Sequence, residues 1–195
     1  MSQEKVGLRQ EAQVKIGSIG DGNVGGVLSR LWREAGHDGR AGGRDSVAEV
    51  AAHGEVVLLA VPAEAVEAAL NAAGSLDGKV LIDATNDLNG ERLSQAGHVA
   101  GLAPGARVVK AFNASFAAVF EQAAQLDIRA NLVFCGDDED AKETVSGLIC
   151  DIGMDPVDVG GLDQAPNVEA FARLNVNLAF GQHRGLLVYR FDTLS

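Results

Sequence analysis

The chain has 195 residues, of which 47% are hydrophobic and 22% are charged. This is the composition of an ordinary globular protein, and the length suits one compact domain. The net charge is −11 at pH 7 and no basic stripe occurs, which argues against nucleic acid or an anionic membrane surface as the main partner. No apolar run is long enough to cross a membrane.

Residues 1–13 are polar and mixed in charge, without the apolar core of a signal peptide, and are expected to form an extension outside the fold. Residues 14–195 are expected to form a single domain, with residues 154–195 as a C-terminal appendage. Cys135 and Cys150 lie in apolar segments without metal-ligand or redox spacing. Both are therefore expected to be buried thiols in a reducing compartment, which indicates a cytoplasmic protein.

Residues 14–19 are expected to form the first strand, and a glycine-rich turn leads from it into a helix. Glycines at 20, 22 and 25 have the G-x-G-x-x-G spacing of a dinucleotide-binding turn. The first glycine permits a tight turn, the second lets backbone approach a pyrophosphate, and the third lets the helix pack near the strand. The helix N-terminus supplies N–H groups and partial positive charge. Such a turn can also join strand and helix without a ligand, but this strand–helix context favours a cofactor site formed by Gly20, Asp21, Gly22, Asn23, Val24 and Gly25.

Residues 37–43 are rich in glycine and charge, which disfavour a strand, yet a βαβ unit needs its second strand here. The residue after this strand reads the adenosine ribose: an acid accepts from the 2′-hydroxyl, and an arginine pairs with a 2′-phosphate. Gly43, Arg44 and Asp45 occupy this place. Arg44 indicates NADP, while Asp45 leaves NAD possible. The alternative for Arg44 is an exposed loop arginine.

Ser46 and Glu49 form a capping-box pattern that predicts a helix ending at Gly54. Further on, strand patterns at 55–62, 79–84, 107–113, 131–135 and 155–159 alternate with helical patterns at 63–73, after 113, at 141–152 and from 167 to the end, the last broken at Gly181 and Gly185. This alternation predicts an α/β fold of the Rossmann type, with a doubly wound, mostly parallel sheet and a small C-terminal appendage of helix and strand.

Ligands of an open α/β sheet collect outside the carboxyl ends of its strands. This rule selects Val61 and Pro62 after one strand, and Thr85 and Asn86 after the next. Lys110, a charge in an apolar strand, is expected to meet either a phosphate or an acidic neighbour.

The next strand end supplies candidates for a second substrate, Phe112 and Asn113. Asn86 and Asn113 either orient a nicotinamide carboxamide or substrate carbonyl, or cap the backbone beyond their strands. Phe112 and Phe116 form an apolar wall for a planar substrate, or at least one of them packs in the core.

The familiar catalytic sets are missing from the sequence. Tyr189 has no lysine four residues on, and no nucleophile elbow, P-loop or metal-binding H-E-x-x-H occurs. The four histidines are scattered, so surface or capping roles are expected. Neither a catalytic residue nor a metal site is therefore predicted. Direct hydride exchange between two planar redox cofactors suits such a site, because the cofactors carry the chemistry.

Taken together, the motifs resemble those of NADP reductases dependent on coenzyme F420, a deazaflavin. The similarity covers about residues 14–191. It rests on the glycine turn, Gly36-His37, Gly42-x-Arg44, Leu59-Ala60-Val61-Pro62, Val109-Lys110-Ala111-Phe112-Asn113, Cys135-Gly136-Asp137-Asp138, Asp158-Val159-Gly160-x-Leu162 and Leu174-x-x-x-Leu178-Ala179-Phe180-Gly181.

The resemblance implies a Rossmann domain with a small C-terminal part that closes over the nicotinamide, often in a homodimer. It implies that the glycine turn holds the pyrophosphate and Arg44 the 2′-phosphate, that Val61 and Pro62 flank the cofactor, and that the remaining strand-end residues lie near the nicotinamide. These are Thr85, Asn86, Phe112, Asn113 and Ala114.

Three residues depart from the family pattern: Asp21 replaces a small neutral or hydroxyl residue, Gly43 a common serine, and Arg40 an apolar strand residue. A carboxylate at position 21 should repel cofactor phosphates by about 1 kcal/mol or more where it is poorly solvated. Gly43 removes a hydroxyl donor to the 2′-phosphate. These departures reduce the expected specificity for NADP.

Three functions follow from these patterns. The first is an NADPH-dependent oxidoreductase that exchanges hydride with a small-molecule acceptor such as F420, FMN or FAD. The second is a sensor or partner protein that holds NADP(H) without turnover. The third is a reductase of a small carbonyl or imine, which would need a proton donor.

Overall fold

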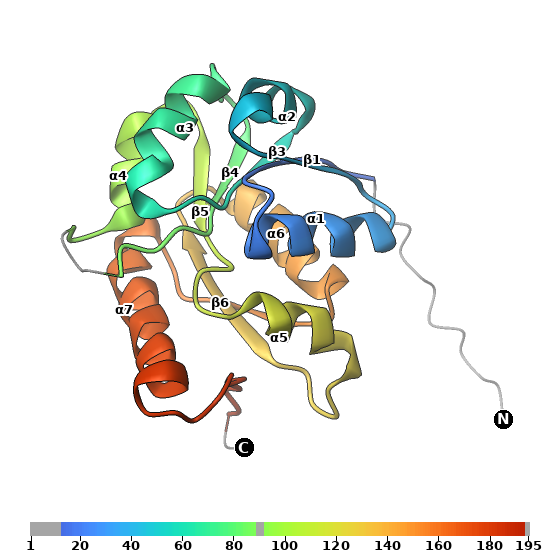
Figure 1. Ribbon diagram of the computed structural model, residues 1–195, viewed down its shortest axis with the longest axis vertical. Helices are drawn as coiled ribbons and strands as arrows, with labels where there is room; N and C mark the ends of the chain where they lie inside the picture. Colours follow the sequence, from blue (N-terminus) through green and yellow to red (C-terminus); the bar gives the residue numbers. More distant parts are fainter. Residues whose placement is uncertain (1–12, 89–91, 194–195) are drawn as a thin grey trace, which may run out of the picture.

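The computed structural model describes residues 13–88 and 92–193, so the expected N-terminal extension lies outside it apart from Gln13. The chain forms a seven-stranded sheet with helices on both faces (Figure 1). Its strands lie in the order β2-β1-β3-β4-β5-β6-β7. Neighbouring strands of this sheet are parallel except β5 and β6, which pair antiparallel, so β6 and β7 run opposite to the other five. The strands are β1 Lys15–Ile19, β2 Asp38–Gly42, β3 Val56–Leu59, β4 Val80–Asp83, β5 Arg107–Lys110, β6 Asn131–Gly136 and β7 Asp155–Asp158. The predicted Rossmann-type α/β fold is confirmed.

Two layers of helices cover the sheet. One hydrophobic core joins the sheet to α1, α5 and α6, and a second joins it to α2, α3 and α4. A third, smaller core joins β6 to α4 and α7. The sequence analysis did not predict α4. The helices are α1 Asn23–Glu34, α2 Val47–His53, α3 Val66–Ala73, α4 Gln95–Leu102, α5 Ala117–Gln122, α6 Glu139–Asp151 and α7 Ala165–Val176.

The edge strand β2 forms despite its poor strand propensity because its glycines let two helices approach it closely. A Cβ on Gly39 would lie 2.9 Å from the carbonyl oxygen of Ser29 in α1. A Cβ on Gly42 would lie 2.5 Å from the hydroxyl of Ser46, just before α2. The glycines that weaken the local propensity are thus required by the packing.

Three aromatic rings form the centre of the larger core. Trp32 of α1 lies edge-on to Phe112, with the ring centroids 5.5 Å apart, and Phe112 lies edge-on to Phe120 at 5.9 Å. The buried Trp32 indole donates a hydrogen bond to the carbonyl oxygen of Leu148 in α6, at 3.0 Å. These contacts join α1, α5, α6 and the end of β5.

The C-terminal part begins within the sheet, because β7 pairs with β6. Helix α7 then runs along one side of the molecule, and the chain after it turns back toward β6 (Figure 1). β5 pairs only with the last two residues of β6, so the edge of β6 ahead of them is left for this returning segment. There Asn131 N–H donates to the carbonyl oxygen of Tyr189, and Val133 N–H donates to its phenol oxygen.

Three local expectations were wrong. Ser46 does not cap α2: its hydroxyl donates to the Gly43 carbonyl, and a 3₁₀ turn, Arg44–Ser46, precedes the helix. Cys150 is exposed, because it lies on the solvent side of α6, whereas Cys135 is buried as expected. The helical pattern predicted from residue 167 breaks at Gly181, as predicted, after a π-helical turn at Asn177–Gly181, but it does not resume, because residues 182–193 are not helical.

Within the described part of the chain, no helix combines the length and apolar character that crossing a membrane requires.

Candidate cofactor site

The first and third glycines of the turn after β1 leave no room for a side chain. Gly20 has a φ of +107°, and a Cβ there would lie 2.3 Å from the carbonyl oxygen of Ala60. A Cβ on Gly25 would lie 1.9 Å from the carbonyl oxygen of Gly20. The turn is therefore packed tightly between β1, the end of β3 and the start of α1, at the point where the strand order reverses.

The second glycine faces open space. Gly22 has an ordinary φ of −71°, and a Cβ there would meet nothing within 4 Å. It precedes α1, whose N-terminus has no side-chain cap and no acidic residue in its first turn. The first N–H groups of a helix have no partner within it, so they are available to an anion. This arrangement fits a pyrophosphate, as the spacing predicts.

A cavity of ≈ 340 Å³ extends from this turn between β2 and α3. Its volume lies at the lower end of the range of about 300–1,000 Å³ for small-molecule sites. Its lining joins the glycine turn, the end of β2 and the end of β3 to an alanine face of α3: Ile19, Gly20, Asp21, Gly22, Gly43, Arg44, Val47, Ala60, Val61, Pro62, Ala65, Ala68, Ala69 and Ala72. The alanines leave space that longer side chains would fill.

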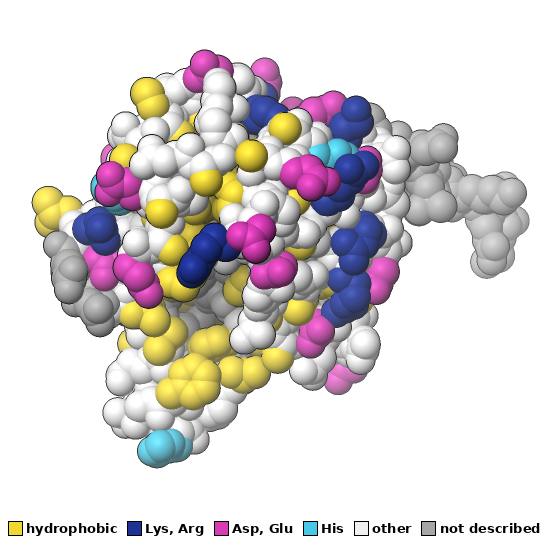
Figure 2. Space-filling view, turned by 45° about the horizontal axis from the view of Figure 1, so that its top comes forward, with side chains coloured by type: hydrophobic (Ala, Val, Ile, Leu, Met, Phe, Trp, Pro, Cys, Tyr) yellow, Lys and Arg dark blue, Asp and Glu magenta, His cyan; other side chains and the backbone are white. Residues whose placement is uncertain are grey.

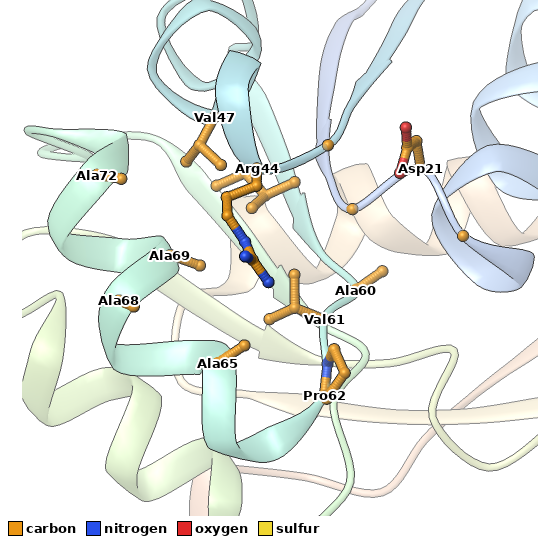
Figure 3. A pocket seen from close by; sticks show the side chains of 14 residues that line it. Asp21, Arg44, Val47, Ala60, Val61, Pro62, Ala65, Ala68, Ala69 and Ala72 are labelled. Carbon is orange, nitrogen blue, oxygen red and sulfur yellow. The ribbon is translucent and has the colours of Figure 1, made fainter.

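Two opposite charges occupy different sides of this cavity (Figure 3). The Arg44 side chain extends from the end of β2 toward the alanine face of α3 and Val61, while Asp21 lies on the loop after β1. Asp45, the other charged candidate, does not line the cavity. On the face of the molecule that Figure 2 shows, acidic side chains lie among basic ones, and hydrophobic side chains border a hollow.

The residues present fit a nicotinamide dinucleotide. The turn offers backbone N–H groups to the pyrophosphate, Arg44 offers a cation to a ribose substituent, and the apolar lining suits the adenine ring. Asn23 and Val24 lie in the first turn of α1, beside Gly22, but do not line the cavity.

A buried ion network lies at the carboxyl ends of β4 and β5. Lys110, fully buried, donates to Asp83 Oδ2 at 2.9 Å and to the Thr85 carbonyl, and lies 3.6 Å from Glu169 Oε1. The Thr85 hydroxyl donates to Asp83 Oδ1 at 2.6 Å. Lys110 therefore meets acidic neighbours and is not accessible to a phosphate.

Glu169 of α7 also accepts hydrogen bonds from the backbone N–H groups of Gln95 and Ala96, both at 2.9 Å. The network therefore fixes α4 and α7 to the sheet edge. Beside it, burial raises the pKa of the Cys135 thiol to about 12 despite the nearby Lys110, so this thiol stays protonated at neutral pH.

Asn86 and Asn113 bind each other. Asn86 Nδ2 donates to the Asn113 carbonyl at 2.8 Å, and Asn113 Nδ2 donates to Asn86 Oδ1 at 3.0 Å. Asn86 thus caps the backbone, one of its two expected roles. The buried Asn113 Oδ1 has no hydrogen-bond partner among the described residues, so its capacity to accept a hydrogen bond is unused.

The other candidates at the end of β5 differ in exposure. Phe112 is 1% exposed and packs in the core, as one alternative predicted, so its side chain cannot contact a substrate. Phe116 is half-buried and lies edge-on to Phe180, with the centroids 5.6 Å apart. Ala114 is buried, and its carbonyl accepts from Asn175 Nδ2 of α7 at 2.8 Å.

Sequence reasoning missed Glu169 and Asn175, which connect α7 to the strand ends. The sequence does hold a pattern that could have identified them, because both lie at helical spacing among apolar residues. The buried residues of α7 are Ala165, Val168, Glu169, Ala172 and Asn175. A charged or amide residue on an otherwise apolar face requires a buried partner.

Comparisons with known proteins agree with this geometry. The model of a family described as NADP oxidoreductase, coenzyme F420-dependent, matches residues 41–87. This segment runs from the end of β2 past the end of β4 and includes Gly43, Arg44, Val61, Pro62 and Asn86.

Among curated proteins, the chain is similar to Metalloreductase STEAP3 of Rattus norvegicus, with 39% identity over 120 residues. The match covers 60% of this chain but 24% of that protein, so the chain spans about a quarter of the relative's length.

Two solved structures share the fold. A proposed F420-dependent NADP reductase from Arthrobacter sp. FB24 has a TM-score of 0.83 at 24% identity, covering 92% of this chain and all of that one. A reductive aminase from Aspergillus terreus, in complex with NADPH4, has a TM-score of 0.67 at 18% identity, covering 89% of this chain and 64% of that one. The family match over residues 41–87 supports the resemblance to coenzyme F420-dependent NADP oxidoreductases that the sequence motifs indicate, and the solved structures share the fold.

Proposed function

We propose that the chain transfers hydride between NADP(H) and a planar flavin or deazaflavin acceptor. The observation that supports this proposal is that the strand ends beside the dinucleotide cavity carry neutral amides, while the titratable groups there are buried and paired. Neutral amides, Asn86 and Asn113, lie there, while the titratable groups Asp83 and Lys110 are buried and paired below them. No proton donor is offered to a substrate by these groups, and hydride exchange between two cofactors requires none from the protein.

In this proposal the chain's own residues bind and orient. The glycine turn holds the pyrophosphate, and Asn113 Oδ1, the buried acceptor without a partner, receives a hydrogen bond from the nicotinamide carboxamide. The bound nucleotide supplies the hydride. The ion network of Asp83, Lys110 and Glu169 holds the strand ends and α7 in fixed positions. Fixed positions favour hydride transfer, because the reaction depends on the alignment of the reacting atoms.

The second candidate is reduction of a small carbonyl or imine. The fold shared with the Aspergillus terreus reductive aminase favours it. Such a reaction also needs a proton for the product oxygen or nitrogen, and the buried, paired groups at the strand ends do not supply one. The third candidate, binding without turnover, needs only the cavity and the glycine turn.

The test is a turnover assay on the purified chain. NADPH is mixed in separate reactions with F420, FMN, FAD, a cyclic imine and a ketone, and the absorbance of the reduced nicotinamide is followed. We expect its loss with a flavin or deazaflavin and not with the imine or ketone.

Turnover with the imine or ketone alone would replace the first proposal by the second. Nucleotide binding measured by calorimetry, without turnover of any acceptor, would support a sensor. Absence of both binding and turnover would contradict all three functions.

A further inference from the structure

We infer that Asp21 is a specificity-determining residue that opposes the 2′-phosphate of NADP(H) and accepts a hydrogen bond from the 2′-hydroxyl of NAD(H), so that the site takes both nucleotides. This inference rests on the proposed function, because it concerns how the same cavity reads its nucleotide.

The position of the Asp21 carboxylate carries the inference. A Cβ on Gly43 would lie 3.1 Å from Asp21 Oδ2 and 3.3 Å from Oδ1. The carboxylate therefore lies directly against the residue that follows β2. In this fold that place reads the adenosine ribose, and a carboxylate there accepts from the 2′-hydroxyl. Asp21 thus supplies, from the loop after β1, the group that NAD-binding relatives of the fold carry after β2.

The same contact explains why position 43 is glycine. Any side chain there would approach the Asp21 carboxylate within 3.1–3.3 Å, closer than most Cβ contacts, so one of the two would have to move. Asp21 and Gly43, which both depart from the family pattern, thus form a matched pair: the acid at one position occupies the space beside the other.

The two charged side chains that line the cavity, Asp21 and Arg44, are not neutralised by ion pairs with other described residues. Within the described parts of the chain, neither Asp21 nor Arg44 forms an ion pair. Arg44 extends toward the alanine face of α3 rather than toward Asp21 (Figure 3). A ribose held between them is offered a cation on one side and an anion on the other. A 2′-phosphate gains from Arg44 and loses from Asp21, whereas a 2′-hydroxyl gains from Asp21.

Calorimetric titration of NADP⁺ and NAD⁺ tests this inference without any turnover. Asp21→Asn removes the charge with little change of shape, and we expect NADP⁺ to bind about tenfold more tightly, while NAD⁺ binds no more tightly than to the unchanged chain. Asp21→Ser is a second variant with the same expected direction. Arg44→Ala should shift the preference the opposite way, weakening NADP⁺ far more than NAD⁺.

Glu67→Gln is the matched control. It removes one negative charge from an exposed position on α3 that does not line the cavity, so it reports the effect of net charge alone. A preference that moves in Asp21→Asn and Asp21→Ser but not in Glu67→Gln, and moves less at high salt, supports the inference.

Equal preference in Asp21→Asn, Glu67→Gln and the unchanged chain would overturn the inference and leave the proposed function intact. Failure of both nucleotides to bind the unchanged chain would overturn the proposed function, and the inference with it.

Discussion

At the scale of single residues, the glycines of the first turn differ in what a side chain would meet. Gly20 and Gly25 are required by the fold, since a Cβ at either position would overlap a backbone carbonyl. Gly22 is not, since a Cβ there meets open space. The fold therefore does not explain this glycine, whereas close approach of a pyrophosphate does.

This difference predicts separate effects of two substitutions. Gly22→Ala should leave the thermal midpoint nearly unchanged and weaken nucleotide binding about tenfold or more, or ~1.4 kcal/mol, because the methyl group enters the cradle. Gly20→Ala should lower the thermal midpoint as well, because the residue has a φ of +107° and no space for a Cβ. Calorimetric binding and thermal unfolding measure the two effects.

Gly101→Ala in α4 is the control, because a Cβ there also meets nothing within 4 Å and the position is far along the chain from the turn. It should leave nucleotide binding unchanged and should not lower the thermal midpoint, because alanine is favoured over glycine within a helix. Unchanged nucleotide binding in Gly22→Ala would contradict the assignment of the turn as a pyrophosphate cradle.

Phe112 has an unusual backbone conformation for a bulky residue. Its φ of 63° is in the left-handed region, which is strained for a bulky residue. This conformation accompanies burial of the ring between Trp32 and Phe120, directly before the paired amide of Asn113. Strain at the end of β5 is thus compensated by core packing beside the candidate site.

At the scale of elements, the buried ion network fixes β4, β5, α4 and α7 to one another. Lys110→Met should lower the free energy of unfolding by about 3–5 kcal/mol, because Asp83 and Glu169 would remain buried without a cation. Denaturant unfolding measures the loss.

Lys15→Met is the control, because Lys15 lies on the neighbouring β1 and is exposed. Its effect should stay within about 0.5 kcal/mol. The double variant Lys110→Met with Asp83→Asn should recover part of the stability, because it removes one uncompensated charge. Lys110→Met and Lys15→Met variants of equal stability would show that the network does not hold these elements together.

At the scale of the whole molecule, two weak acids, the buried Cys135 and the half-buried Tyr189, link stability to alkaline pH. Burial raises the pKa of Tyr189 and that of Cys135 to about 12 each, from ordinary values of 10.0 and 9.0. Both groups therefore lose their protons earlier in the unfolded chain than in the folded one. Stability should be unaffected by them below about pH 9 and should fall as the pH rises toward 12.

Denaturant unfolding between pH 8 and about 12 measures this fall. Tyr189→Phe should make the decline above pH 10 shallower, because it removes one of the two groups. Tyr189 is the only tyrosine of the chain, so tyrosinate absorbance follows its ionisation directly. Ionisation of the native chain near pH 10 would contradict the packing of this phenol against β6.

The sequence by itself determined the glycine turn and the alternation of strands and helices up to α7, apart from α4, because these depend on local periodicity and on spacings of a few residues. It also predicted β2, since a βαβ unit requires it, although the physical reason for its glycines is the close approach of α1 and α2. Candidates at strand ends followed from the topology of parallel sheets.

Only the tertiary structure decided which of those candidates meet. In the folded chain, the Phe112 ring packs in the core. Lys110 forms ion pairs with Asp83 and with Glu169 of α7, and Asn86 forms hydrogen bonds with Asn113. The tertiary structure also set the Asp21 carboxylate against Gly43 from a different strand. These contacts join residues that are far apart in the chain. Their distances depend on how the whole sheet and its helices pack, and local sequence patterns do not determine that packing.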